Sequence, residues 1–203
     1  WQRSLTHDIP SEFIYLGAFF LGEFIDVNGD GRPDYVVSYD NKGLITQTAW
    51  LNTETGWQES AVHAPPFVKW VLEENSGGPR AKGGYLDVNG DGLVEFVGRA
   101  IWLNTGSGWT GGGRMPSGLF GGLLVRVKGD FADINGDGKP DLISSYIDDA
   151  GIPVSGVWLG TRAGFSRTSQ FYLPYELFDL STGTPSGAVL ADIHRDGLPD
   201  GIQ

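Results

Sequence analysis

The stretch Asp26–Asp34, DVNGDGRPD, decides how this chain is interpreted. Side chains that carry oxygen stand at its positions 1, 3, 5 and 9, and a glycine stands at position 6. A hard cation such as Ca²⁺ takes about six to eight oxygen ligands, which alternate residues of a tight loop can supply. Glycine permits the positive φ that such a loop requires. The stretch therefore predicts a calcium-binding loop, with position 7 contributing only its backbone carbonyl.

The same loop recurs along the chain. It recurs as Asp87–Glu95 (DVNGDGLVE), as Asp133–Asp141 (DINGDGKPD) and, in a more divergent form, as Asp192–Asp200 (DIHRDGLPD). A bare Asn-Gly turn has no need of three crowded carboxylates, which repel one another in the absence of a cation. The ligands predicted for the first three loops are Asp26, Asn28, Asp30, Arg32, Asp34, Asp87, Asn89, Asp91, Leu93, Glu95, Asp133, Asn135, Asp137, Lys139 and Asp141.

The fourth copy leaves two interpretations open, because His194 replaces the asparagine and Arg195 replaces a glycine. It is either a fourth calcium site or a metal-free turn closed by a salt bridge. The ligands of that fourth site would be Asp192, Asp196, Leu198 and Asp200. An EF-hand is disfavoured for all copies, because position 12 is never acidic and strand-like sequence follows each loop.

A second motif alternates with the acidic loop. It reads AWLNTETGW at Ala49–Trp57, IWLNTGSGW at Ile101–Trp109 and VWLGTRAGF at Val157–Phe165. Its closing aromatic residue falls at positions 1, 57, 109 and 165, which divides the chain into units of about 1–56, 57–108, 109–164 and 165–203. The glycine before that aromatic residue predicts a hairpin turn in each unit.

Short runs of β-branched and aromatic residues flank every loop and are too short for helices. A brief helix is conceivable only around Val68–Glu74. About four strands per unit predict an all-β protein, a β-propeller of four-stranded antiparallel blades. Because three units and most of a fourth are present, we expect a fragment of a propeller with roughly six to eight blades.

Composition excludes several functions. The chain lacks cysteine, which rules out disulfides, zinc–thiolate sites and a cysteine nucleophile. Its formal net charge is −11 and no basic patch is visible, so nucleic acid is not an expected partner. No run of about 18 uncharged apolar residues occurs, so no membrane-spanning helix is expected.

With its acidic loops, the chain resembles the FG-GAP/VCBS repeat family, the calcium-loop repeats of integrin-α-like propellers. The pattern Phe-x-Asp-x-Asn-Gly-Asp-Gly-x-Pro-Asp stands at Phe24–Asp34 and Phe131–Asp141, with variants at Tyr85–Glu95 and Leu190–Asp200. The Trp-Leu-Asn-Thr motif is similar to repeats of Rhs and insecticidal toxin-complex proteins. The resemblance implies an extracellular or cell-surface propeller with Ca²⁺ in its loops.

Three functions follow as hypotheses. The first is a non-catalytic recognition or adhesion module that binds a protein, a glycan or other domains of a parent chain. Its expected contact surfaces are segments 65–84, 111–122 and 172–187, whose aromatic residues either meet a ligand or fill space between blades. Those aromatic residues are Trp70, Phe120, Phe171, Tyr172 and Tyr175.

The second is a structural segment of a toxin shell or surface filament, and the third is a polysaccharide hydrolase or lyase. For the third, no catalytic residue can be named. The chain has neither a Gly-x-Ser-x-Gly elbow nor a His-Glu-x-x-His helix, and we expect His7, His63 and His194 to be surface or turn residues. We therefore expect no enzymatic activity.

Overall fold

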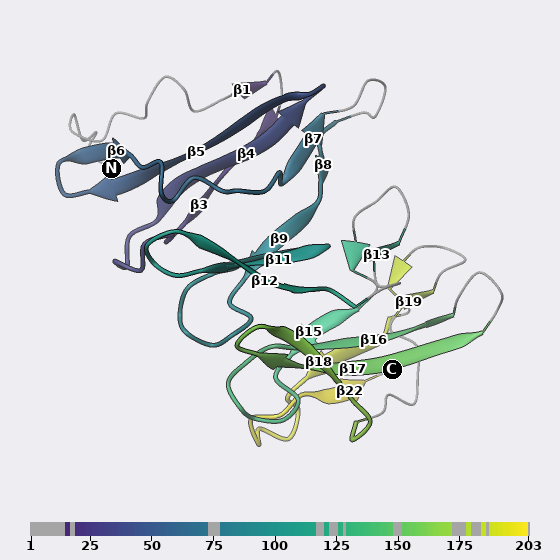
Figure 1. The fold of residues 1–203 in the computed structure, drawn as a ribbon. Coiled ribbons are helices and arrows are strands. Elements are labelled where there is room, and N and C mark those ends of the chain that lie inside the picture. Colours follow the sequence, from purple (N-terminus) through teal and green to yellow (C-terminus); the bar gives the residue numbers. More distant parts are fainter. Residues whose placement is uncertain are drawn as a thin grey trace. The chain divides into compact units, whose positions relative to one another are not determined.

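The computed structural model describes residues 15–16, 19–72, 78–116, 120–121, 126–127, 129–147, 152–171, 178–179, 184–185 and 187–202. Within these residues the chain forms strands and turns and no helix, which confirms the predicted all-β class (Figure 1). The chain separates into two compact units, Trp1–Leu86 with Gly92–Gly111, and Asp87–Asp91 with Gly112–Gln203. No helix long and apolar enough to cross a membrane occurs in the described part.

The first acidic loop lies between the first two strands of an antiparallel sheet. This sheet runs in chain order through β3 (Gly22–Ile25), β4 (Asp34–Asn41), β5 (Leu44–Thr53) and β6 (Gly56–Glu59). Tyr35 pairs with Phe24 on one side and with Trp50 on the other. The pair β7 (Trp70–Leu72) and β8 (Arg80–Ala81) extends the sheet, because β7 pairs in parallel with the far half of β4.

The other acidic loops occupy the same place in later sheets. The second sheet contains β9 (Gly83–Leu86), β10 (Glu95–Gly98), β11 (Ala100–Asn104) and β12 (Trp109–Arg114). The third contains β15 (Asp130–Ala132), β16 (Asp141–Ile147), β17 (Pro153–Thr161) and β18 (Gly164–Thr168), with β19 (Phe178–Asp179) and β20 (Thr184–Pro185) added. The fourth loop joins β21 (Val189–Ala191) to β22 (Asp200–Ile202). The pairs β1 (Tyr15–Leu16) with β2 (Phe19–Phe20), and β13 (Phe120–Gly121) with β14 (Arg126–Val127), complete the strands.

The Trp-Leu-Asn-Thr motif forms the predicted hairpins. In the first sheet, Asn52 pairs with Trp57, and the Thr53 hydroxyl donates to the carbonyl of Gly56 at 2.6 Å. The equivalent threonines, Thr105 and Thr161, bond the carbonyls of Gly108 and Gly164 in the same way. The glycine before the aromatic residue has a φ between 127° and 136° in all three hairpins. The motif is therefore a turn signature as well as a packing signature.

Segment 65–84, predicted as a contact surface, contains strands β7 and β8. Around Val68–Glu74 the described residues form strand β7, and no helix is found among them. Phe67 and Lys69 are buried, with 7% and 5% of their surface exposed. Trp70 is half-buried and packs against the core residues of the first sheet. Part of this expected contact surface is therefore core, because the inserted strands extend the sheet that they follow.

Some expectations concern residues outside the described part. These are the aromatic residue at Trp1, the histidine His7, and Tyr172 and Tyr175 in segment 172–187. The strand that contains Phe120 is described, but its side chain is not.

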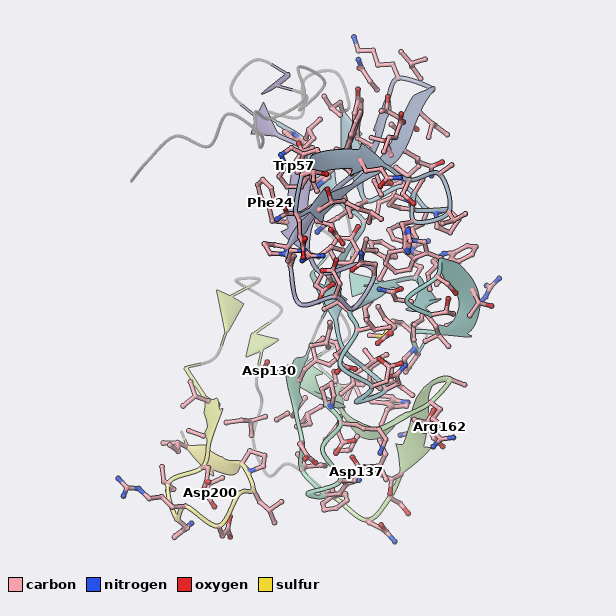
Figure 2. All side chains as sticks on the ribbon, turned by 90° about the vertical axis from the view of Figure 1, so that its left-hand side faces the viewer. Phe24, Trp57, Asp130, Asp137, Arg162 and Asp200 are labelled. Carbon is pink, nitrogen blue, oxygen red and sulfur yellow. The ribbon has the colours of Figure 1, made fainter. Side chains whose placement is uncertain are left out.

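Each face of the first sheet has its own apolar cluster. One face carries Leu21, Tyr35 and Val37, against which Trp50 and Trp57 pack. Phe24 lies beside Trp57, with ring centroids 6.2 Å apart (Figure 2). The opposite face carries buried Val27, Val36 and Ala49, and Trp109 of the second sheet packs against it. Consecutive sheets in this unit therefore meet face to face, as stacked sheets do.

Candidate metal-binding loops

The carboxylate at position 1 organises the turn of each loop. In the first loop, Asp26 Oδ1 accepts hydrogen bonds from the backbone N–H groups of Gly29 and Asp30, at 2.8 and 3.1 Å. Asp26 Oδ2 accepts from Gly31 at 2.7 Å. The N–H of Asp30 also points at Asn28 Oδ1, 3.0 Å away, so the oxygens of positions 1 and 3 converge on one atom.

The other copies follow this pattern. In the third loop, Asp133 accepts from Gly136, Asp137 and Gly138 at 2.8, 3.1 and 2.7 Å. In the second loop, Asp87 Oδ1 accepts from Gly90 and Asp91, and Asn89 Oδ1 accepts from Asp91 at 2.9 Å. The regular spacing of oxygens read from the sequence thus produces one loop conformation, held by Asx-type turns.

The closing carboxylate at position 9 is a buried cross-link. Asp34 is completely buried, and its two oxygens accept from the N–H groups of Val27 at 3.1 Å and Asn52 at 2.8 Å. Asp141, also fully buried, accepts from Ile134 at 3.1 Å and Gly160 at 2.7 Å. This carboxylate therefore ties the acidic loop to the third strand of its own sheet. Glu95 closes the second loop and is equally buried.

Charge crowding acts on these closing acids. Burial raises the pKa of Asp34, the hydrogen bonds from Asn52 and Val27 lower it, and the charges of Asp30 and Asp26 raise it again. Asp141 has the same balance, with Asp137 and Asp133 as the neighbouring charges. A cation among these carboxylates would remove the repulsion.

Position 7 has a role that the sequence did not reveal. A Cβ placed on Gly29 would lie 2.9 Å from Leu93 Cδ2, so position 7 of the second loop packs against position 4 of the first. A Cβ placed on Gly90 would lie 3.1 Å from Lys139 Cγ, and one placed on Gly136 would lie 3.3 Å from Leu198 Cδ2. Position 7 therefore needs an aliphatic stem, although its terminal chemistry varies. Position 4 needs glycine for space and for its φ of 73° to 75°.

Where position 7 is basic, its charge pairs within its own loop. Arg32 Nη2 and Asp30 Oδ2 are 2.9 Å apart, and Lys139 Nζ and Asp137 Oδ2 are also 2.9 Å apart. The Lys139 ammonium holds the pKa of the Asp137 carboxyl below its usual range. These cations neutralise part of the acidic cluster in the first and third loops.

Position 2 of the first loop accepts a hydrogen bond from the second sheet. Val27 is completely buried, and its carbonyl accepts a hydrogen bond from the Asn104 side chain at 3.0 Å. Nearby, His63 joins the same sheets, since its Nε2 lies 3.1 Å from the carbonyl of Gly106 and its own carbonyl accepts from Trp109 Nε1. His63 is thus a buried turn residue.

The third sheet has a close backbone contact at the position equivalent to Asn104. Gly160 replaces the asparagine there, and a Cβ on it would lie 2.6 Å from the carbonyl oxygen of Pro140 and 3.3 Å from that of Val88. The substitution in the motif is therefore explained by close backbone packing.

The fourth loop uses its histidine as a donor. His194 Nδ1 lies 2.9 Å from Asp200 Oδ2, and the backbone N–H groups of Ile193 and His194 bond the same oxygen (Figure 2 labels Asp200). Hydrogen bonding to Asp200 raises the pKa of His194, and the charges of Asp196 and Asp192 add to this rise. Arg195 adopts a φ of 59°, where the other copies have glycine. His194 and Asp200 thus close this loop, and they form an ion pair when the imidazole is protonated.

The donor set of the first three loops suits a hard cation. Their side-chain donors are carboxylate and amide oxygens, without nitrogen or sulfur ligands. Among the described residues, no group of three or more His, Cys, Asp or Glu side chains is drawn together tightly enough to hold a metal ion. The carboxylates instead face backbone N–H groups, so an ion would bind in addition to these bonds.

Neither the protein-family models nor the curated proteins compared with this chain give a match. The resemblance to FG-GAP/VCBS repeats therefore rests on the sequence motifs.

Proposed function

We propose that this chain is a calcium-stabilised segment of an extracellular or cell-surface β-propeller of FG-GAP/VCBS type, which recognises a protein or glycan without catalysis. The observation that carries the proposal is the repeated position of the acidic loop. It joins the first two strands in each of the three larger sheets and the two strands β21 and β22, and in the first and third sheets its closing carboxylate bonds the third strand. An ion held there would stabilise the loop together with the strands that it joins.

Calcium would be held by the loop oxygens at positions 1, 3, 5 and 9 and by the carbonyl at position 7. At about 1 mM Ca²⁺ and a Kd of about 10⁻⁴ M, each site adds roughly 1.4 kcal/mol to the free energy of unfolding. Three occupied loops would add about 4 kcal/mol, a large share of the net stability of a domain. The fourth loop, closed by His194 and Asp200, takes no ion in this proposal.

Thermal unfolding with and without calcium tests the proposal. We expect excess chelator to lower Tm by about 10 °C, since about 1 kcal/mol shifts Tm by a few degrees in a chain of this size. An unchanged melting curve would contradict it. Metal analysis should find three Ca²⁺ per chain, and Asp133→Ala should reduce this by one.

A matched control lies beside the third loop. Asp130 is exposed and outside the nine-residue motif (Figure 2), so Asp130→Asn should keep the full calcium content. Equal losses in both variants would show that general acidity, and not the loop, retains the ion.

A further inference from the structure

A groove lies on the third sheet, where the edge strand β18 ends beside β17. Its volume is about 440 Å³, which is within the range of small-ligand sites. It is lined by Ser155, Gly156, Arg167, Thr168, Ser169 and Phe171. The lining combines three hydroxyl groups, one guanidinium and one half-buried aromatic ring.

The first sheet shows how the groove arises. There, Trp50 pairs with Glu59, and the Thr48 hydroxyl donates to Glu59 Oε1 at 3.2 Å. In the third sheet, Trp158 pairs with Arg167, so arginine stands where the first sheet has glutamate. Gly156, two residues before Trp158, stands where the first sheet has Thr48. Two side chains that bond each other are thus replaced by a glycine and a cation.

The glycine is needed for the position of the tryptophan. A Cβ on Gly156 would lie 2.5 Å from Trp158 Cη2, so the indole rests against the bare backbone. The Arg167 guanidinium lies over the same ring, 5.8 Å from its centroid. Stacking on an aromatic face holds a guanidinium in a fixed plane while its N–H groups stay available.

Arg167 has no acidic partner within the part of the chain that the structure describes. Its side chain is exposed and lies over the ring of Trp158. By comparison, Arg32 and Lys139 are paired with carboxylates of their own loops. A planar guanidinium with no acidic partner among the described residues is suited to bidentate binding of a carboxylate.

We infer that this groove binds a carboxylated sugar, with the uronate carboxylate on Arg167. The hydroxyl groups of Ser155, Thr168 and Ser169 offer both donors and acceptors to sugar hydroxyls. The ring of Phe171 packs against the core of the third sheet, and its exposed part offers an apolar surface for the C–H face of the sugar. This inference rests on the recognition function proposed above and gives it a ligand class and a location.

Titration of the ¹⁵N-labelled full chain with two probes tests the inference by NMR. Methyl β-D-glucuronide and methyl β-D-glucoside differ only at C6, which is a carboxylate in the first and a hydroxymethyl group in the second. We expect the glucuronide to bind at about millimolar Kd, with shifts confined to β17, β18 and residues 169–171, and the glucoside to bind about tenfold more weakly. Equal affinities for the two, or no binding of the glucuronide at about 50 mM, would overturn the inference.

Variants separate the guanidinium from general charge. Arg167→Gln should weaken glucuronide binding about tenfold, and Arg167→Glu, which restores the residue of the first sheet, should abolish it. Arg162→Gln removes the same charge from the exposed turn of the same hairpin (Figure 2) and should leave the affinity unchanged. Circular dichroism spectra should match the parent for all three. Equal effects of the variants at 162 and 167 would contradict the assignment.

Succinate distinguishes sugar recognition from plain anion binding. If it binds as tightly as the glucuronide, the groove is an anion site and the sugar assignment is wrong. The calcium experiment is independent of these titrations, because the groove residues lie outside the acidic loops. Loss of glucuronide binding with intact calcium stabilisation therefore refutes the groove alone.

Discussion

The side chain of Asn104 donates a hydrogen bond to the carbonyl of Val27 at 3.0 Å, and both residues are buried. One belongs to the third strand of the second sheet, and the other is position 2 of the first acidic loop. Asn104 Oδ1 also accepts from the N–H of Gly106 at 3.0 Å. A single amide thus supports a hairpin turn and joins two consecutive sheets.

This relationship predicts unequal effects of two similar substitutions. Asn104→Ala leaves a buried carbonyl and an N–H without partners, and should lower the free energy of unfolding by about 1–3 kcal/mol. Asn52→Ala removes the equivalent side chain of the first sheet. The amide of Asn52 donates to the carbonyl of Pro33, in the acidic loop of the same sheet, at 3.3 Å and near the surface. That variant should lose about 0.5 kcal/mol or less. Urea denaturation measures both, and equal losses would contradict the role given to Asn104.

The closing carboxylate should matter even without metal. Asp34→Asn turns one acceptor oxygen into an amide group that opposes a backbone N–H, either that of Val27 or that of Asn52. We expect a loss of about 2–3 kcal/mol in chelator. Glu54→Gln, in the exposed turn of the same sheet, is the control and should change stability little. A full loss that appears only with calcium present would show that Asp34 acts through the ion alone.

Position 7 should tune calcium affinity. Lys139→Leu removes the ammonium that pairs with Asp137 but keeps an aliphatic contact with Gly90, as Leu93 does with Gly29. We expect the third loop to bind Ca²⁺ about three- to tenfold more tightly, because the ion no longer competes with a resident cation. Leu93→Lys should have the opposite effect on the second loop. Calorimetric titration of the two variants checks this, and affinities unchanged in both would refute it.

The fourth loop should show a pH dependence of its own. The pKa of His194 is raised, chiefly by its hydrogen bond to Asp200, so protonated His194 stabilises the loop below its ordinary pKa of about 6.5. That contribution disappears as the pH rises through the raised value. The pKa of Asp200 is lowered, first by its bond to His194, so the pair also weakens as the pH falls through that lowered value.

Titration of the His194 ring by NMR measures this effect. The pKa should lie above about 6.5 in the parent and fall toward it in Asp200→Asn. Calcium should leave the His194 pKa unchanged if the loop takes no ion. A clear fall on adding calcium would show that Ca²⁺ competes for Asp200, which is the alternative interpretation of this copy.

Much of the fold could be predicted from local patterns. The β-branched runs around each acidic loop, and the Gly-Trp end of each Trp-Leu-Asn-Thr motif, predict strands and hairpins because their signals are local. Strand β7 was not predicted, because its parallel partner β4 is distant in sequence and no local pattern indicates such a pairing; the third sheet has the same addition, since β19 pairs in parallel with β16. Phe67, near the start of this segment, is a second example. It stacks on Phe96, 29 residues later, with ring centroids 3.9 Å apart, and no periodicity of the sequence predicts such a contact.

The sequence by itself determined the all-β class, the hairpins and the shape of the acidic loops, because turns and alternating strands depend on neighbouring residues. Only the tertiary structure decided what several loop positions do. It showed that Asp34 binds a strand 18 residues away, that Leu93 covers Gly29, and that Asn104 reaches Val27. These contacts join residues that are distant in sequence, and their partners are backbone groups or glycines, which leave no distinctive side chain to recognise.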